Sequence, residues 1–487
     1  MQNLLASSLR ILGVSVAVAA FAAFPVAAKP YTLDELLDLA KKNSPTLAAT
    51  EKATAAVEAQ LEEAQRMKLP SGDLSTMIAP TPEIRCTTGT QAPSTWTGSA
   101  DSWRLSHCDG TDWSFDKSRF TDAITNLSGV FSRTELKLIQ PLYTFGKISS
   151  GIAAGEAGVR ASKHRQQGAI AELELTLRKA YFGAKLAREI LATLDEGLGY
   201  IDQAQKKIDK DLSEGNGDSS VIDRLRMRTV RAEIEARMLE AKRMASIAKS
   251  GLRALIGPSA PNDLEVDDEP LVPVAVKARP LKAYQEDATD NRPELKAMEN
   301  LVAVKRALAD VEWKKQYPDL VLIGTAQFAY ANKVDHPKNA FANDPFNSSG
   351  VGLAAALRMP LDLGVRNAKA HRLQAEAEET SAKHREAQAG IGYEVEKAFS
   401  ELEETTERLK VLQKGEKASR QWIAALSQNT AVGVGEAKDF ADALIAFFKA
   451  RMSYLQAIFD FNMSAAALAR ASGVASETAP QSASASP

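Results

Sequence analysis

Two long segments of this chain carry the same landmarks in the same order, and this repeat constrains the fold most strongly. The Asn-x-Pro motif at residues 43–45 returns at 291–293, 248 residues later. The Pro-Leu pair at 141–142 returns at 360–361, where the spacing has fallen to 219. Self-similarity of this kind indicates a duplicated structural unit. The first copy therefore carries 29 more residues than the second, between positions 70 and 141.

The landmarks divide the chain into five parts. We predict a first repeat over residues 29–257, a linker over 258–280 and a second repeat over 281–473. The linker is rich in proline and acidic residues, and the Ser/Ala/Pro tail at 474–487 is expected to be disordered. Residues 1–28 combine a basic residue, an apolar run and an Ala-x-Ala-like end, which predicts a signal peptide. No later apolar stretch approaches the length of a membrane-spanning helix.

Each repeat is predicted to run helix, strand, loop, strand, long helix, tight turn and long helix. The opening helices are expected over 33–67 and 281–315, each stopped by a proline. In the second repeat, residues 320–330 and 351–359 alternate with a period of two and leave one face apolar. Residues 135–140 alternate more weakly, and residues 71–125 are expected to form a loop between the strands of the first repeat.

Heptad spacing marks the long helices. The run over 147–213 has apolar residues at alternating steps of four and three, and residues 391–412 follow the same pattern. Such heptads predict that the helix packs against other helices with left-handed supercoiling. The members of the first stripe are Leu173, Leu177, Ala180, Ala184, Ala187, Leu191, Leu194, Leu198 and Ile201.

Composition excludes several classes of protein. The net charge of −2 lacks the basic excess of a nucleic-acid binder. Five histidines and two cysteines leave little for a metal site. A Ser-x-x-Lys match at 246–249 lies in a helix without the motifs that accompany it in hydrolases, and there is no P-loop. We therefore expect no enzyme, no cofactor and no bound metal.

The two cysteines, Cys86 and Cys108, lie in a polar segment of the first repeat. Export makes a disulfide between them plausible, because oxidising compartments preserve such bonds. Two free thiols or half of a metal site are the alternatives. Because only His107 lies nearby and there is no second cysteine pair, the disulfide is favoured.

Four strands per chain with one lipid-compatible face cannot close a barrel by themselves, and open strand edges are costly in hydrocarbon. Three copies would supply twelve strands, which falls within the range of closed outer-membrane barrels. A barrel of this size leaves a pore, because its interior is too wide for side chains to fill. The sequence therefore predicts an α+β membrane protein whose barrel is completed by oligomerisation.

Four motifs accompany this arrangement: Tyr31–Leu37, Asn43–Pro45, Gln140–Gly146 and the turn from Gly433 to Asp439. With these motifs in this order, the chain resembles the TolC-type outer membrane factor family over essentially its whole mature length. This resemblance implies a homotrimer in which a twelve-stranded outer-membrane β-barrel continues into a periplasmic α-helical coiled-coil barrel. It implies docking to a periplasmic adaptor and an inner-membrane pump that exports drugs, small molecules or proteins. It also implies that the strand-connecting loops face outside.

The family places its periplasmic entrance at the helical turns and rings that entrance with carboxylates. Alignment on Gly433 places Asp439 and Asp442 at the aperture, three residues apart and so on one helix face. The alternative is that they are carboxylates at a helix N-terminus, which the helix dipole favours anyway. Asp223, the first-repeat counterpart of Asp439, is expected at the same aperture, whereas Arg226 replaces the counterpart of Asp442. The turn tips expected to dock the adaptor contain Gly215, Gly217, Gly433 and Gly435.

Three aromatic residues lie near strand ends: Tyr143, Phe328 and Tyr330. They could belong to the aromatic girdles of a membrane barrel, or they could pack within the chain. Two rival functions account for less of the sequence. A periplasmic coiled-coil adaptor without a pore would explain the helices but does not need the alternating strands. A secreted enzyme with a helical stalk would need a catalytic constellation that the sequence does not contain.

Overall fold

The structure is a computed structural model that describes residues 30–81, 84–86, 103–105, 127, 129–214, 220–336, 344–431 and 437–474. The expected signal peptide, most of the loop predicted over 71–125 and almost all of the tail lie outside these residues. The chain divides into two compact units, and each draws on both halves of the sequence. The helical unit contains Met1–Asn43, Leu177–Leu271 and Gly415–Phe459; the sheet unit contains Ser44–Thr176, Val272–Lys414 and Asp460–Pro487.

Proline breaks the opening helix of each half. Sequence analysis predicted single helices over 33–67 and 281–315, and both predictions were wrong in the same way. The helices α1 (Leu33–Asn43) and α2 (Pro45–Arg66) are separate, as are α6 (Leu281–Asn291) and α7 (Pro293–Lys314). The residues at the breaks, Ser44 and Arg292, have extended ψ angles of 125° and 118°. Proline causes this because its ring excludes the helical conformation from the preceding residue.

The elements of the two halves match in order and in length. The opening helices have 11 and 22 residues in both halves. The first long helices have 68 and 69 residues, and the returning helices both have 36. The remaining elements are β1 (Pro30–Tyr31), β2 (Ser71–Thr81), β3 (Ile84–Cys86), β4 (Trp103–Leu105), β5 (Gly129–Tyr143), α4 (Lys147–Glu214), α5 (Val221–Ile256), β6 (Glu265–Val266), β7 (Asp319–Ala331), β8 (Ser348–Arg358), α8 (Leu363–Ala431) and α9 (Ala437–Ser472).

Strand β2 corrects the predicted boundary of the first-repeat loop. Residues 71–81 were assigned to the loop over 71–125, but they form an eleven-residue strand that pairs antiparallel with β5. Leu74 and Ile78 lie opposite Leu136 and Ser132 in this pairing. Pairing with a long neighbour therefore fixes a strand whose own alternation, interrupted by Gly72 and Pro80, is weak.

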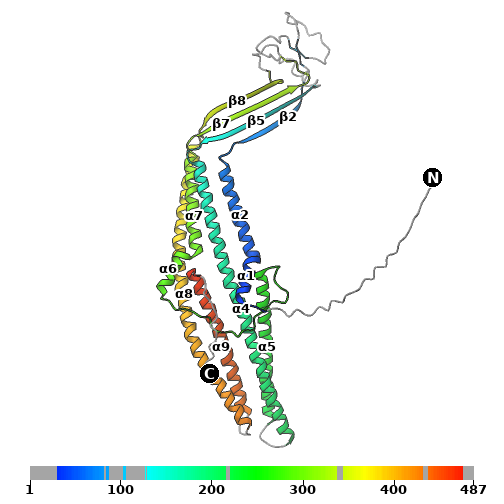
Figure 1. Cartoon of the computed structure of the whole chain (residues 1–487), viewed down its shortest axis with the longest axis vertical. Helices are drawn as coiled ribbons and strands as arrows, with labels where there is room; N and C mark the ends of the chain where they lie inside the picture. Colours follow the sequence, from blue (N-terminus) through cyan, green and yellow to red (C-terminus); the bar gives the residue numbers. More distant parts are fainter. Residues whose placement is uncertain are drawn as a thin grey trace, which may run out of the picture. The chain divides into compact units, whose positions relative to one another are not determined.

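The sheet unit contains one four-stranded antiparallel sheet in the order β2-β5-β7-β8 (Figure 1). Ser71 lies opposite Ile139, and Asp319 lies opposite Arg358. The start of β2, the end of β5, the start of β7 and the end of β8 consequently share one end of the sheet. The helices α2, α4, α7 and α8 all join the sheet at this end.

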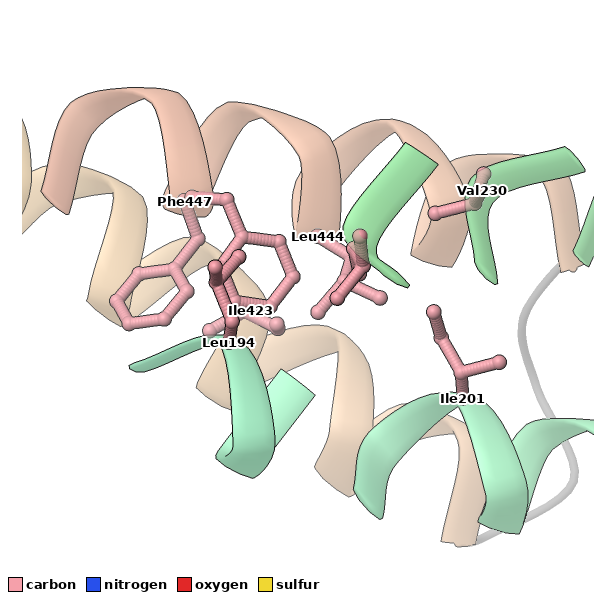
Figure 2. Close-up of a cluster of buried hydrophobic side chains, with 8 residues drawn as sticks. Leu194, Ile201, Val230, Ile423, Leu444 and Phe447 are labelled. Atoms are coloured by element: carbon pink, nitrogen blue, oxygen red, sulfur yellow. The ribbon is translucent and has the colours of Figure 1, made fainter. Parts of the chain in front are cut away.

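The core of the helical unit is built from α4, α5, α8 and α9. Figure 2 shows Leu194 and Ile201 of α4 beside Val230, Ile423, Leu444 and Phe447 from the other three helices. Leu177, Ala187, Leu194 and Ile201, all members of the predicted heptad stripe, are at most 1% exposed, which confirms the stripe. Gly197 lies in this interface, and a Cβ there would come within 1.9 Å of the Phe448 ring. The absence of a side chain at Gly197 therefore lets α9 approach α4 closely.

A buried ionic cluster holds the linker against α4 within the helical unit. The Asp267 carboxylate accepts a hydrogen bond from the Tyr181 hydroxyl and lies 2.6 Å from the Lys185 ammonium. The Asp267 and Lys185 side chains are 11% and 6% exposed. Arg188 donates to the Asp267 carbonyl at 2.5 Å and to the Glu269 carbonyl at 2.8 Å. Directly before Asp267, strand β6 of the linker pairs with β1, which gives the linker a second attachment within the helical unit.

Asp267 makes the stability of the protein depend on pH. Burial acts to raise the pKa of this carboxyl, but hydrogen bonds from Lys185 and Tyr181 outweigh burial and hold the pKa below its ordinary value. In the unfolded chain the pKa of an aspartate is about 3.9. Because the pKa of Asp267 is lower than this in the folded protein, its ionised carboxylate stabilises the fold at pH values above about 3.9. This stabilisation is lost as the pH falls through the folded-state pKa.

We predict that Asp267→Asn lowers the free energy of unfolding near neutral pH by about 3 kcal/mol, because Lys185 is left buried without its counter-ion. Unfolding of detergent-solubilised protein, followed by circular dichroism in urea, measures the change. The difference in the free energy of unfolding between the wild type and the variant should become smaller below about pH 4, as Asp267 becomes protonated in the wild type. Asp268→Asn is the matched control, since this neighbouring side chain is 92% exposed and should change little. If the difference in the free energy of unfolding stayed constant below about pH 4, Asp267 would not be the source of the pH dependence.

Candidate functional site

The two faces of the four-stranded sheet differ completely in charge. The strand register places alternate residues on opposite sides, so that the face of each residue follows from its pairing. The four strands contain six charged residues, and the register places all of them on one side, the polar face. These six are Asp73, Arg133, Glu135, Lys137, Asp319 and Arg358.

The opposite side, the apolar face, carries no charged residue on any of the four strands. Leu74, Val351 and Leu353 on this face are 71%, 90% and 75% exposed within one chain. Exposed apolar patches of this extent mark surfaces that another molecule or a membrane covers. The other large apolar residues on this face are Ile78, Val130, Leu136, Leu138, Leu320, Leu322, Phe328, Tyr330 and Leu357.

The polar face is stabilised by contacts between its own side chains. Arg133 lies 2.6 Å from the Glu135 carboxylate, its neighbour two residues along the strand. The Arg133 guanidinium also reaches the Gln327 side-chain oxygen on β7 at 3.4 Å. At the helical end of the sheet, Lys147 makes an ion pair with Asp319 at 2.7 Å. This face can line an aqueous space, whereas the apolar face cannot.

Aromatic residues lie at both ends of the apolar face. Phe328 and Tyr330 are near the end of β7 that leads to the β7–β8 connection. Tyr143 ends β5 at the helical end of the sheet, where its ring lies 4.7 Å from that of Phe145. The three predicted aromatics, Tyr143, Phe328 and Tyr330, are each at least half exposed within one chain.

The predicted acidic residues lie at the starts of α5 and α9. Asp223 forms a reciprocal capping box with Ser220, and its carboxylate also pairs with Arg226 at 3.1 Å. Hydrogen bonds from the Ser220 side chain and backbone lower the pKa of Asp223. Asp439 and Asp442 are exposed in the first two turns of α9, and neither makes an ion pair with any residue that the structure describes. Asp223 therefore has a local partner that Asp439 and Asp442 lack.

Several predicted residues belong to segments that the structure does not describe. Gly215, Gly217, Gly433 and Gly435 lie outside the described residues, and so does Cys108. Cys86 is the last residue of β3, which pairs in parallel with β4. The disulfide and the docking role of the four glycines stay predictions.

Sequence reasoning missed the residues that β2 contributes and the buried cluster around Asp267. A signal for β2 was present in the alternation of Leu74, Thr76 and Ile78 with Asp73, Ser75 and Met77. No sequence signal joins Asp267 to Lys185, because 82 residues separate them along the chain. Within the described ranges, no group of three His, Cys, Asp or Glu side chains is arranged to hold a metal ion. No helix in the same ranges is both long enough and apolar enough to cross a bilayer.

Comparison with known proteins connects this geometry to a family. Residues 285–474 match the model of the outer membrane efflux protein family. No curated protein matches the chain in sequence.

Solved structures share the fold at low sequence identity. The outer-membrane channel OprN is 17% identical, with a TM-score of 0.68 over 91% of this chain and 89% of its own. The CmeC outer membrane channel of Campylobacter jejuni is 16% identical, with a TM-score of 0.67 over 91% of this chain and 85% of its own. The MtrE outer membrane channel of Neisseria gonorrhoeae, in its open state, is 17% identical, with a TM-score of 0.67 over 91% and 89%. The chain therefore has the fold of these outer-membrane channels, and the resemblance predicted from the sequence is confirmed.

Proposed function

We propose that this chain, a TolC-type outer membrane factor by its fold and by the family match over its second half, forms the outer-membrane channel of a tripartite export system. Three copies form a twelve-stranded barrel in the outer membrane, and their long helices continue the duct through the periplasm. A periplasmic adaptor joins the duct to an inner-membrane pump, which supplies the energy. Drugs, other small molecules or secreted proteins pass through the lumen to the exterior.

The separation of charge between the two faces of the sheet carries this proposal. A sheet with an uncharged, exposed apolar face suits hydrocarbon on that side, and its charged side suits a water-filled lumen. The outermost described strands, β2 and β8, each have only one neighbour in the sheet. Their outer backbone groups would be left without hydrogen-bond partners in a bilayer unless another copy supplied a strand. Pairing of β8 with β2 of the next copy satisfies these groups, and three copies close the ring.

The length of the apolar face fits a bilayer. Leu320 and Tyr330 are ten residues apart on β7, which at about 3.4 Å per residue corresponds to about 34 Å along the strand. Strands of outer-membrane barrels are tilted by roughly 40°, which reduces this height to about 26 Å. The apolar band of such barrels is about 25 Å tall and is flanked by aromatic residues on both sides. Phe328 and Tyr330 then belong to the outer girdle and Tyr143 to the inner one.

The matching halves supply two strands each to this barrel. We infer that they arose by duplication, as the repeated landmarks predict, because their helices agree in length and break at equivalent prolines. A periplasmic adaptor without a pore would leave the entire apolar face in water. The channel is therefore the better explanation of the sheet.

The helical hairpin tips form the periplasmic entrance in this proposal. Asp439 and Asp442 of α9 are exposed, three residues apart and without an ion-pair partner in the part of the chain that the structure describes. Three copies would bring six such carboxylates to a constriction, where they attract cations.

The oligomer and the pore are tested together. We expect the purified protein in mild detergent to have the mass of three chains by light scattering. Added to a planar bilayer, it should conduct ions through discrete channels. Monodisperse single subunits without conductance would overturn the proposal.

Arginine substitutions on adjacent residues of β8 test the assignment of the two faces. Leu353→Arg places a charge on the apolar face and should cost about 2–4 kcal/mol at the bilayer midplane. We expect strongly reduced heat-stable trimer in outer-membrane fractions. Ala354→Arg is the matched control because Ala354 is exposed on the polar face, where arginine would meet water. Equal loss with both variants would reject the assignment.

Replacing Asp439 and Asp442 together with alanine tests the entrance. We expect a weaker block of single-channel current by multivalent cations added on the periplasmic side, because the variant removes six charges from the trimer. The control is the double variant Glu233→Ala with Glu240→Ala, which removes two exposed carboxylates per chain from α5. Block that is unchanged in the first variant would reject the entrance assignment.

A further inference from the structure

The connection between β7 and β8 folds back over the sheet. Its described parts, residues 332–336 and 344–347, belong to the end of the sheet that lies away from the helices. Val334 is 6% exposed and Phe346 is partly buried, and both pack into one apolar cluster with residues of β5 and β7. The Phe346 ring meets the Phe131 ring edge-on, with 5.8 Å between the ring centres. The connection is therefore held against one face of the sheet.

Strand register identifies this face as the polar face. Ala329 lies directly opposite Arg133, and Phe131 lies opposite Ala331 two residues away along each strand. Phe131, Ala329 and Ala331 are 8%, 4% and 2% exposed. The polar face therefore has a buried apolar patch at this end, although its charged residues lie nearer the helices. In the proposed channel the polar face lines the lumen, so that the connection lies inside the duct at its outer mouth.

Hydrogen bonds tie both described parts of the connection to the sheet. The Asn347 side-chain oxygen accepts a hydrogen bond from the Ala331 backbone N–H at 2.8 Å, and its amide nitrogen donates to the Val334 carbonyl at 3.0 Å. The Asn332 backbone N–H donates to the Val130 carbonyl at 3.2 Å. Its side-chain oxygen accepts from the Val130 N–H at 2.8 Å. The pairing of β5 with β7 is thereby extended into the connection.

A turn at Asp344 positions Phe346. One carboxylate oxygen of Asp344 accepts hydrogen bonds from the backbone N–H groups of Phe346 at 2.9 Å and Asn347 at 3.0 Å. Aspartate stabilises turns by local bonds of this kind. On the other side of the connection, a Cβ at Gly129 would come within 3.0 Å of the Lys333 side chain. The connection is therefore closely packed on the polar face as well as hydrogen-bonded to the sheet.

We propose that the β7–β8 connection narrows the outer mouth of the channel and limits the size of the molecules that leave it. This inference rests on the proposed function and adds to it a determinant of substrate size, the contact of Phe346 with Phe131. Three copies would place three such connections around one mouth. Side chains alone do not fill the interior of a twelve-stranded barrel. Segments that fold inward are therefore what reduces its width.

Apolar burial keeps the connection in its inward position. If the connection moved out of the mouth, Phe131, Val334 and Phe346 would be exposed to the water of the lumen, which is unfavourable for apolar side chains. Removing one of these side chains weakens the attachment without changing the charge of the lumen. Substitution of Phe346 or Val334 by serine should therefore release the connection and widen the mouth.

Labelling of a thiol on the inner side of the connection measures the width of the mouth. Thr325→Cys places this thiol on the polar face, opposite Lys137 and nearer the helices than the apolar cluster. Intact cells are treated with maleimides that carry polyethylene glycol chains of increasing mass, and labelled protein is detected by its gel mobility. The chain without this substitution gives the background from Cys86 and Cys108.

Three further substitutions are each combined with Thr325→Cys. Phe346→Ser and Val334→Ser should both shift the labelling cut-off to longer polyethylene glycol chains. Tyr330→Ser is the matched control, because Tyr330 lies at the same end of β7 but on the apolar face, and it should leave the cut-off unchanged. The amount of heat-stable trimer in outer-membrane fractions shows which variants assemble. Either Phe346→Ser or Val334→Ser decides the question if the other does not assemble.

An unchanged cut-off in the assembled Phe346→Ser and Val334→Ser variants would overturn the proposed narrowing and leave the channel intact. An equal shift in Tyr330→Ser would overturn it as well, because the width would then not depend on the contacts of the connection. If even N-ethylmaleimide failed to label Thr325→Cys, the polar face would not line an aqueous space, and the proposed function itself would have failed.

Discussion

The architecture depends most on the backbone hydrogen bonds at the two edges of the four-stranded sheet. β2 and β8 each have one neighbour among the described strands, and the exposed apolar face excludes water as a partner if the sheet lies in a bilayer. An unpaired peptide group in hydrocarbon costs several kcal/mol, and each edge presents a row of them. Side chains cannot supply hydrogen-bond partners for a whole row of peptide groups. Only another strand can, which is why the proposed channel needs more than one copy of the chain.

The same sheet determines where the helices begin. Because β2, β5, β7 and β8 alternate in direction, the chain enters or leaves the sheet four times at one end. The heptad stripe of α4 supplies part of the surface on which α5, α8 and α9 pack in the helical unit. In the helical unit, close packing depends on small residues such as Gly197, against which the Phe448 ring is seated.

Local sequence patterns predicted which helices and strands exist better than they predicted where each one begins and ends. Periods of two and of seven correctly identified the strands of the second half and the buried stripe of α4, because each reflects burial on one face. The proline breaks at Ser44 and Arg292 were missed, although the prolines themselves had been used as landmarks of the repeat. In contrast, β2 could not be located securely from its own residues, because the long neighbour β5 holds it in place. The cluster of Tyr181, Lys185 and Asp267 depends on how the linker returns to α4, and no local pattern contains that information.

The two halves also differ in charge where their hairpins turn, and the difference bears on the entrance of the proposed channel. In the first half, the Ser220 backbone N–H and hydroxyl donate hydrogen bonds to the Asp223 carboxylate, and Arg226 makes an ion pair with it. At the equivalent positions of the second half stand Glu436 and Asp442, which can give Asp439 neither a hydroxyl nor a cation. The carboxylate is therefore present in both halves, but its hydroxyl and cationic partners stand only in the first. Any ring of negative charge at the entrance would then come mainly from the second half, and the first half would contribute capped helix ends that stiffen the tip.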